Sequence, residues 1–257
     1  MMDSIQHPAS TLWDRHHPAS YPVGVVGVRR PIPGPSFFPG GYGLWDAKID
    51  APLPVFPVSG VMVLGHDFHS ETGYEASLER RRESENQPTW RNLLKLLRAA
   101  DVPLERCFFT NFYMGLRKGK VTTGVFPGAT DKDFRRHCSE FLIEQLKAMR
   151  PSVIVTLGKY VPALIAPLSS DLNGWLDSKT FRHIDEAGPV QWHCAFEGVP
   201  DFETTIVALV HPSMRHASIG RRTYKNHKGH HAEMAMLRDA LAMIGPGSQL
   251  TPRTGMS

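Results

Sequence analysis

The feature of this sequence that most constrains its fold is a series of short apolar runs that alternate with longer amphipathic segments. Residues 61–65 (VMVLG) and 153–158 (VIVTLG) are too short to be core helices and are typical of strands buried on both faces. We also predict strands at residues 107–114 and 204–210, and a weaker one at residues 191–196. The sequence therefore predicts enough strands for a sheet of four or five strands.

Three segments have the apolar spacing of helices. The first covers residues 88–100 and follows a loop that we expect to be polar, and the second begins near Thr130 or Asp131 and ends before Pro151. The third follows the last strand. The apolar residues of these helices are, in order, Leu93, Leu94 and Leu97; Phe134, Cys138, Phe141, Leu142, Leu146 and Met149; and Met234, Leu237, Leu241 and Ile244.

Strands that alternate with helices require crossover connections, which favour parallel pairing and helices on both faces of the sheet. The sequence thus predicts a three-layer α/β/α fold with a central, mainly parallel sheet of four or five strands. Open sheets of this kind bind ligands at the carboxyl ends of their strands.

Proline and glycine divide the chain. Residues 1–60 hold ten of the 21 prolines, a density that neither helix nor strand tolerates. We interpret residues 1–60 as an irregular extension, in which Trp13, Phe37, Phe38 and Trp45 suggest partial packing. Residues 61–245 form the main domain, and residues 246–257 a flexible tail.

Composition limits the class of protein. The 257 residues are 41% hydrophobic and include no apolar run long enough to cross a bilayer, and the first residues do not resemble a signal peptide. Cys107, Cys138 and Cys194 are odd in number and form no CxxC pair, so we expect reduced thiols, a cytoplasmic location and no iron–sulfur cluster. We expect a monomer without metal or cofactor.

Polar residues lie at the end of every predicted strand except the weaker one at residues 191–196. Asp67 follows the first, Asn111 lies in the second, Lys159 follows the third and His211 follows the last. Because carboxyl ends of parallel strands share one edge, a carboxylate, an amide and an imidazole should meet there. A carboxylate can stabilise a cationic sugar and orient water, an imidazole can donate to a departing carbonyl oxygen, and an amide can read a base edge.

Four segments, in the right order, resemble the uracil-DNA glycosylase superfamily. Residues 64–69 (LGHDFH) are similar to its Gly-Gln-Asp-Pro-Tyr-His motif, and residues 110–111 (TN) to its base-reading Thr-Asn segment. Residues 146–158 (LKAMRPSVIVTLG) resemble its helix–proline–strand segment, and residues 211–213 (HPS) its His-Pro-Ser motif. The resemblance covers roughly residues 60–245.

The resemblance implies a role for each matching residue. Asp67 would position water, His211 would donate to the base carbonyl as a neutral imidazole, and Asn111 would bind the base edge. Around them, the base-binding candidates are His66, Phe68, His69 and Tyr74, with Trp90 as a further aromatic that could stack on the base. Ser213 would bind a phosphate together with Lys159, and Met214 and Arg215 would enter the helix as the nucleotide flips out.

The first motif departs from the family pattern, because Phe68 and His69 stand where the family has proline and tyrosine. In the uracil enzymes that tyrosine blocks the 5-position of the base, so its absence opens the pocket to 5-substituted pyrimidines. The resemblance therefore leaves two substrates open, uracil or a 5-modified cytosine. Excision of a hypermodified cytosine from phage DNA would make the protein an antiphage enzyme, like the antiphage-type glycosylase of the superfamily.

Basic loops point to DNA as the partner. The net charge is +4, and five basic residues and no acid lie between His211 and His231. Residues 80–82 and 117–120 are further basic segments, although the first is interleaved with glutamates and could be a solvated helix. We expect these loops to contact phosphates. The five residues are Arg215, Arg221, Arg222, Lys225 and Lys228.

Two other interpretations stay open, and a third lacks the motif that it requires. His66, Asp67, His69 and His211 have the side chains of a divalent-metal hydrolase, although neighbours on a strand usually point apart. The chain could also be a DNA-binding module without turnover. A nucleotide-binding Rossmann domain would require a GxGxxG after the first strand, which is absent.

Overall fold

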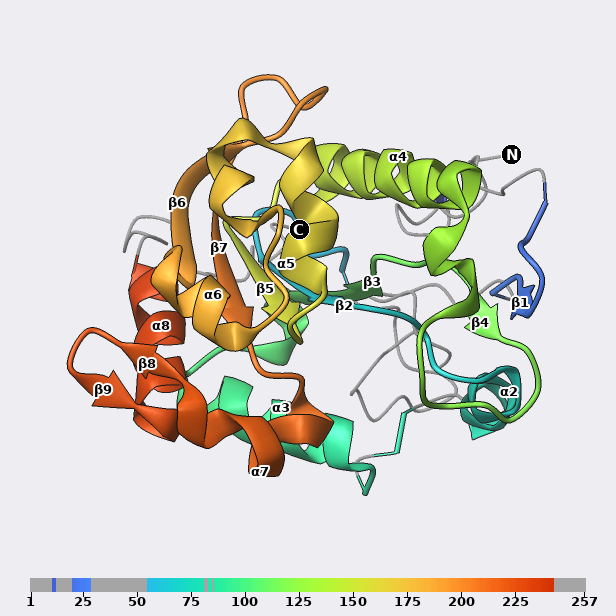
Figure 1. Cartoon of the computed structure of the whole chain (residues 1–257), viewed down its shortest axis with the longest axis horizontal. Coiled ribbons are helices and arrows are strands. Elements are labelled where there is room, and N and C mark those ends of the chain that lie inside the picture. The colour runs from blue at the N-terminus through green and yellow to red at the C-terminus, as the bar shows by residue number, and fades with distance from the viewer. Residues whose placement is uncertain (1–10, 13–19, 29–54, 81–82, 85, 243–257) are drawn as a thin grey trace, which may run out of the picture.

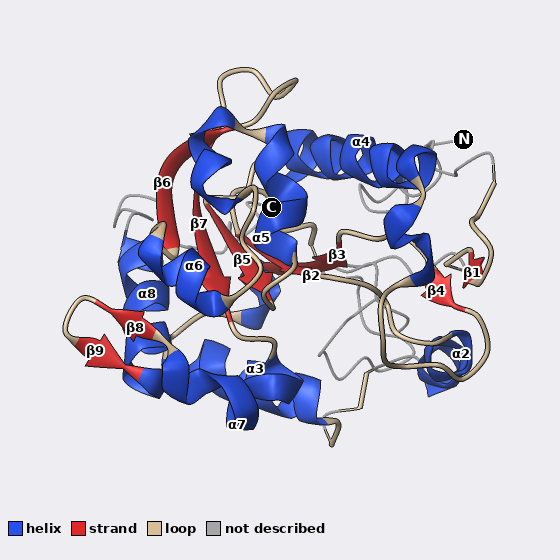
Figure 2. Cartoon of the chain, viewed as in Figure 1, coloured by secondary structure: helices blue, strands red, loops and turns tan. Residues whose placement is uncertain are grey.

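The computed structural model describes residues 11–12, 20–28, 55–80, 83–84 and 86–242. Its centre is a five-stranded sheet in the order β3-β2-β5-β7-β6, with helices on both faces (Figures 1 and 2). The strands are β2 (Val61–Gly65), β3 (Cys107–Asn111), β5 (Val153–Leu157), β6 (Val190–Ala195) and β7 (Glu203–Leu209). The first four in the order are parallel, and β6 runs antiparallel to β7. The predicted three-layer, mainly parallel fold is confirmed.

Strand alternation creates two separate cores. Met62 and Leu64 on β2 face a core formed with α4 (Lys132–Met149), whereas Val61 and Val63 face a core formed with α3 (Pro88–Ala99) and α8 (Gly229–Ala242). All four side chains are at most 3% exposed, as strands buried on both faces require.

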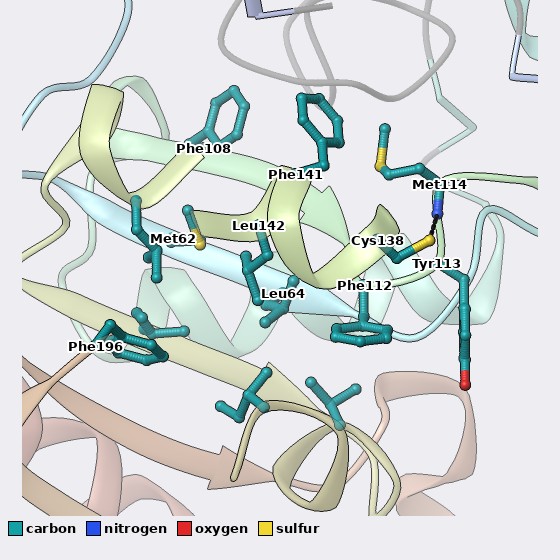
Figure 3. Close-up of a cluster of buried hydrophobic side chains, with 14 of the residues drawn as sticks. Met62, Leu64, Phe108, Phe112, Tyr113, Met114, Cys138, Phe141, Leu142 and Phe196 are labelled. Atoms are coloured by element: carbon teal, nitrogen blue, oxygen red, sulfur yellow. Dashed lines mark hydrogen bonds between the residues drawn. The ribbon is translucent and has the colours of Figure 1, made fainter. Parts of the chain in front are cut away.

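The helix α4 follows the predicted pattern. Asp131 is its N-cap and accepts a hydrogen bond from the Phe134 amide at 2.8 Å, and Arg150 ends it in a left-handed conformation before Pro151. Its six predicted apolar residues are all buried. In Figure 3, Cys138 accepts a hydrogen bond from the Met114 amide at 3.4 Å, which ties α4 to the segment after β3.

Two predicted boundaries were wrong. The strand predicted at residues 107–114 ends at Asn111, because its partner β2 ends at Gly65. The predicted polar loop after β2 contains the helix α2 (Glu71–Arg80), which buries only Tyr74 and Ser77 and so has little apolar periodicity.

The last helix, α8, faces the core with only some of the predicted residues, of which Leu237 is buried. Met236 and Leu237 are buried, whereas Met234 and Leu241 are only partly buried. Ile244 lies outside the described residues. The helix begins at Gly229, earlier than the apolar spacing suggested, because its first turns carry small and polar side chains.

Short elements complete the described fold. The strand β1 (Val25–Val26) pairs with β4 (Leu116–Arg117), so part of the proline-rich segment packs on the main domain. The predicted aromatics Trp13, Phe37, Phe38 and Trp45 lie outside the described residues, as does the predicted tail. The other elements are η1 (Leu104–Arg106), η2 (Pro127–Thr130), α5 (Val161–Ile165), η3 (Ala166–Leu168), η4 (Ser170–Trp175), α6 (Phe181–Glu186), η5 (Pro212–Met214), α7 (Arg215–Ser218), η6 (Ile219–Arg221), β8 (Thr223–Tyr224) and β9 (His227–Lys228).

Among the described residues, no helix has the length and apolar character that a membrane span needs. The three cysteines are free and buried. Burial raises the pKa of the Cys138 thiol to about 12, so it is protonated at neutral pH.

Candidate functional site

A cavity of about 1960 Å³ lies at the carboxyl ends of the parallel strands. Asp67 follows β2, Asn111 ends β3, Lys159 follows β5 and His211 follows β7, and all four line this one cavity. The structure therefore brings together the carboxylate, the amide and the imidazole that the sequence placed at separate strand ends. This is the edge at which open α/β sheets bind their ligands.

The Asp67 carboxylate is fully engaged. Its Oδ1 accepts from the His69 backbone amide at 3.2 Å and from Arg117 Nε at 3.2 Å. Its Oδ2 bonds to His66 Nδ1 at 2.8 Å and accepts from Arg117 Nη2 at 3.1 Å. With two hydrogen bonds on each oxygen, the usual acceptor capacity of a carboxylate is filled.

Arg117, the partner of Asp67, also has all of its hydrogen-bonding groups paired. Beyond its two bonds to Asp67, Nη2 donates to the Gly124 carbonyl at 3.0 Å, and Nη1 donates to those of Thr123 and Val125, both at 3.2 Å. All five donors of the guanidinium thus have acceptors, and the residue is 5% exposed. Arg117 therefore fastens the loop at 123–125 to the carboxylate and cannot reach a DNA phosphate.

These contacts fix the charge of Asp67. Burial alone would raise its pKa, but the hydrogen bonds from His66 and Arg117, together with the positive charge of Arg117, outweigh burial and lower the pKa to about 2. The carboxylate is therefore ionised throughout the neutral range.

His211 is partly buried and lines the same cavity. Burial lowers its pKa, and the negative charge of Asp67 offsets this only in part. Its Nδ1 lies 2.8 Å from Ser213 Oγ. If the hydroxyl donates to Nδ1, the proton of the neutral ring lies on Nε2, which is then a hydrogen-bond donor.

The segment that carries His211 is anchored on both sides. Before it, the Val210 amide donates to Glu233 on α8, and after it, Arg215 donates to the other oxygen of Glu233. Asn92 of α3 also donates to the Pro212 carbonyl at 2.9 Å. The imidazole is thus presented by a backbone with fixed ends.

Asn111 is 3% exposed, and its amide nitrogen has no hydrogen-bond partner among the described residues. A buried, unpaired donor is costly unless a ligand satisfies it. Gly65 makes room for this amide, since a Cβ at Gly65 would lie 2.0 Å from Asn111 Oδ1. The two residues pair in register on β2 and β3, so the glycine and the amide form one unit.

We predict that Gly65→Ala will impair any ligand binding that depends on Asn111. The new methyl group must displace the amide, because 2.0 Å is far inside van der Waals contact. Ligand affinity should fall at least as much as in Asn111→Ala, as measured by fluorescence anisotropy with labelled oligonucleotides. Gly220→Ala, where a Cβ would meet nothing within 4 Å and the backbone is not left-handed, is a control for the loss of a glycine. Unchanged affinity in Gly65→Ala would contradict the role of the amide.

The predicted stacking aromatics are largely buried. Phe68 and Tyr74 are 3% and 1% exposed and pack edge to face with ring centroids 6.4 Å apart, and Trp90 packs on Phe109. Although all three line the cavity, little of their surface is open to a base.

Two tyrosines that sequence reasoning missed also line the cavity. Tyr113 and Tyr160 lie 5.1 and 5.7 Å from the His66 ring, between centroids, and Tyr160 is 57% exposed. Tyr113 directly follows the Asn111-Phe112 pair, and Tyr160 follows Lys159, so proximity to the predicted strand ends was the available signal.

Glu83 was missed as well, because it lies in a segment interpreted as solvated. It is 7% exposed, lines the cavity and accepts from Trp90 Nε1 at 3.1 Å and from Ser77 Oγ at 3.3 Å. Burial raises its pKa to about 7 despite those hydrogen bonds. Its Oε1 is buried without a partner among the described residues.

The remaining predicted residues differ in accessibility. His69 is exposed, with a φ of 77°, and its ring bonds to Ser70 Oγ at 3.3 Å. Lys159 lies with its ammonium 4.8 Å from the Tyr160 ring centroid. Met214 is 51% exposed at the cavity rim, whereas the Arg215 guanidinium faces inward to Glu233 and lies 3.0 Å from His230 Nδ1.

The predicted phosphate-binding set is therefore smaller than expected. Arg222 is completely buried and pairs with Asp185 and Glu233, and Arg117 pairs with Asp67. These ion pairs form because a buried charge needs a partner of opposite charge, and the acidic partners of Arg117 and Arg222 lie far away in the sequence. The remaining exposed basic residues of the His211–His231 segment are Arg221, Lys225 and Lys228.

Among the described residues, no three His, Cys, Asp or Glu side chains converge in a way that could hold a metal ion. The set His66, Asp67, His69 and His211, which the sequence left open, is thus not arranged as ligands. Asp67 instead uses its oxygens on Arg117, His66 and the His69 amide.

Part of the chain matches a known protein family. A family model described as the uracil DNA glycosylase superfamily matches residues 82–229, more than half of the chain. The matched segment contains Asn111 and His211 but not the loop with His66 and Asp67. No curated protein matches the chain.

Proposed function

Because the chain belongs to the uracil-DNA glycosylase superfamily, we propose that it is a monofunctional DNA glycosylase that flips out a pyrimidine-type base and hydrolyses its N-glycosidic bond. The product is an abasic site. The observation that carries this proposal is the shared cavity of Asp67, Asn111 and His211.

Each group suits a part of the reaction. The bond breaks through a cationic sugar and an anionic base, so donors at the base carbonyl lower the barrier as an oxyanion hole does. His211 donates from Nε2 when Ser213 donates to its Nδ1, and the unpaired Asn111 amide donates to the base edge. The ionised Asp67 adds negative charge near the sugar cation.

DNA binds on the cavity rim. Exposed Met214 enters the stack beside the flipped nucleotide, and Lys159 and Ser213 lie at the rim to bind flanking phosphates. Arg221, which lines the cavity, and Lys228 extend the basic face, whereas Lys225 pairs with Asp239 at 2.6 Å. Affinity for DNA is expected to fall steeply as salt rises.

The residues around the cavity favour a base larger than uracil. The cavity of about 1960 Å³ includes both the rim for DNA and the space for the base, so the lining residues and not the volume indicate the substrate. No tyrosine follows Phe68, and the unpaired Glu83 Oε1 is an acceptor for amino or hydroxyl groups. A modified cytosine, such as the glucosylated cytosine of phage DNA, fits these features, and its excision would serve antiphage defence.

We predict abasic-site formation on a panel of oligonucleotides and phage DNA, and almost none with Asp67→Asn. The substitution removes the negative charge and places an amide beside the Arg117 guanidinium. Abasic sites are measured by alkaline cleavage under multiple turnover, and Asp133→Asn, a change at an exposed carboxylate, is the control.

The panel also separates the substrates. Cleavage of uracil DNA alone would reject the larger base, and cleavage of glucosylated DNA alone would support it. If wild type forms no abasic site on any member but binds DNA, the chain is a DNA-binding module without turnover.

A further inference from the structure

The Asp67 carboxylate has no acceptor site left for a water molecule. Its two oxygens accept four hydrogen bonds, and its side chain is 12% exposed. A carboxylate with a pKa of about 2 is also a weak proton acceptor. The group that contacts the attacking water must therefore be found among its neighbours.

His66 is the neighbour whose ring both bonds to the Asp67 carboxylate and lines the cavity, whereas the ring of His69, which also lines the cavity, bonds to Ser70. The side chain of His66 is 24% exposed and is held between the rings of Tyr113, Tyr160 and Phe126. No described residue bonds to its Nε2, whereas its Nδ1 lies 2.8 Å from Asp67 Oδ2.

The pair with Asp67 determines which nitrogen of His66 carries the proton. An ionised carboxylate can only accept, so Nδ1 must be the donor of this hydrogen bond. In the neutral ring, Nε2 then has a free lone pair. The Arg117 guanidinium fixes Asp67 by two hydrogen bonds and keeps it ionised, so the order Arg117–Asp67–His66 holds one tautomer in place.

From this geometry, and resting on the proposed glycosylase function, we propose that His66 is the general base that takes a proton from the attacking water, with Asp67 and Arg117 as positioning residues. The water oxygen bonds to C1′ of the deoxyribose as the C1′–N bond breaks. The electron pair of the broken bond leaves with the base, whose carbonyl oxygen is stabilised by His211. One water proton moves to His66 Nε2, and the resulting imidazolium is stabilised by Asp67.

Chemical rescue tests this role. His66→Gly should lower kcat by about 10²–10⁴-fold, the usual contribution of a positioned general base. Added imidazole should restore turnover in a saturable manner, because the vacated space opens to the cavity. A ring with a merely structural role would give no such rescue. The matched control is His193→Gly, because His193 also pairs with a carboxylate, Glu203 at 3.1 Å, but is exposed on β6, and its φ of 52° suits glycine. We expect wild-type turnover there.

The tautomer provides a readout that needs no substrate. In ¹⁵N-resolved imidazole spectra of the wild-type protein at neutral pH, His66 should carry its proton on Nδ1. In Asp67→Asn, the amide nitrogen facing Nδ1 can only donate, so the proton should move to Nε2.

The outcomes are distinct. Suppose that the wild type forms abasic sites. Normal turnover in His66→Gly, or a loss of turnover that imidazole does not restore, would then overturn the role of His66 and leave the proposed function intact. A proton on Nε2 of the wild-type ring would also overturn it, even if His66→Gly did not fold. Absence of abasic sites with the wild type on every substrate would overturn both proposals.

Discussion

Replacing His211 with alanine is expected to lower the rate of base release by about 10²–10³-fold, the usual cost of removing one donor to a developing oxyanion. The loss should appear in kcat with little change in DNA affinity, because this donor acts on charge that develops only in the transition state. Single-turnover abasic-site assays at saturating enzyme separate the two effects.

His216→Ala is the matched control for this substitution, since His216 is exposed nearby on α7 and does not line the cavity. His211→Gln should retain part of the rate, because an amide can still donate. Turnover of His211→Ala close to that of wild type would show that the base leaves without help from this side chain.

The largest expected effect on stability is that of Glu233→Ala. Glu233 is completely buried, binds the Val210 amide, Arg215 and Arg222, and its removal leaves the buried Arg222 with only Asp185 as an anionic partner. Breaking a buried ion pair from one side typically costs about 3–5 kcal/mol. Urea unfolding, monitored by tryptophan fluorescence, measures the change in the free energy of unfolding.

Glu144→Ala is its control, because Glu144 forms an ion pair with Lys147 in which both side chains are at least 40% exposed. Exposed pairs of this kind contribute about 0–1 kcal/mol. Equal losses in the two variants would mean that Glu233 is not the anchor of the His211 segment.

Prediction from sequence was successful where local patterns decide the structure. Continuous apolar runs predicted the strands β2 and β5, and apolar spacing predicted the helix α4. The predicted strands then identified the sheet edge at which Asp67, Asn111 and His211 lie. These patterns need no knowledge of distant partners, because burial on both faces of a strand leaves a continuous apolar run.

Side-chain partners were not predictable in the same way. Arg117 and Arg222 look like surface cations in the sequence, but their partners Asp67, Asp185 and Glu233 are between 11 and 50 residues away. Glu83 likewise looks solvated among its charged neighbours and is buried by Trp90 and Ser77. A charge run identifies a solvated face only when no apolar partner folds over it.

The fixed ends of the segment between Val210 and Arg215 have a consequence for how target nucleotides are selected. In the proposed function, Met214 enters the DNA stack from between these anchored ends, so the duplex itself must bend and unstack. The energy of deforming the DNA then enters directly into the rate at which a nucleotide is captured. Mispaired or weakly stacked positions, which open at the lowest cost, should then be sampled more often than well-stacked ones, whatever base the pocket accepts.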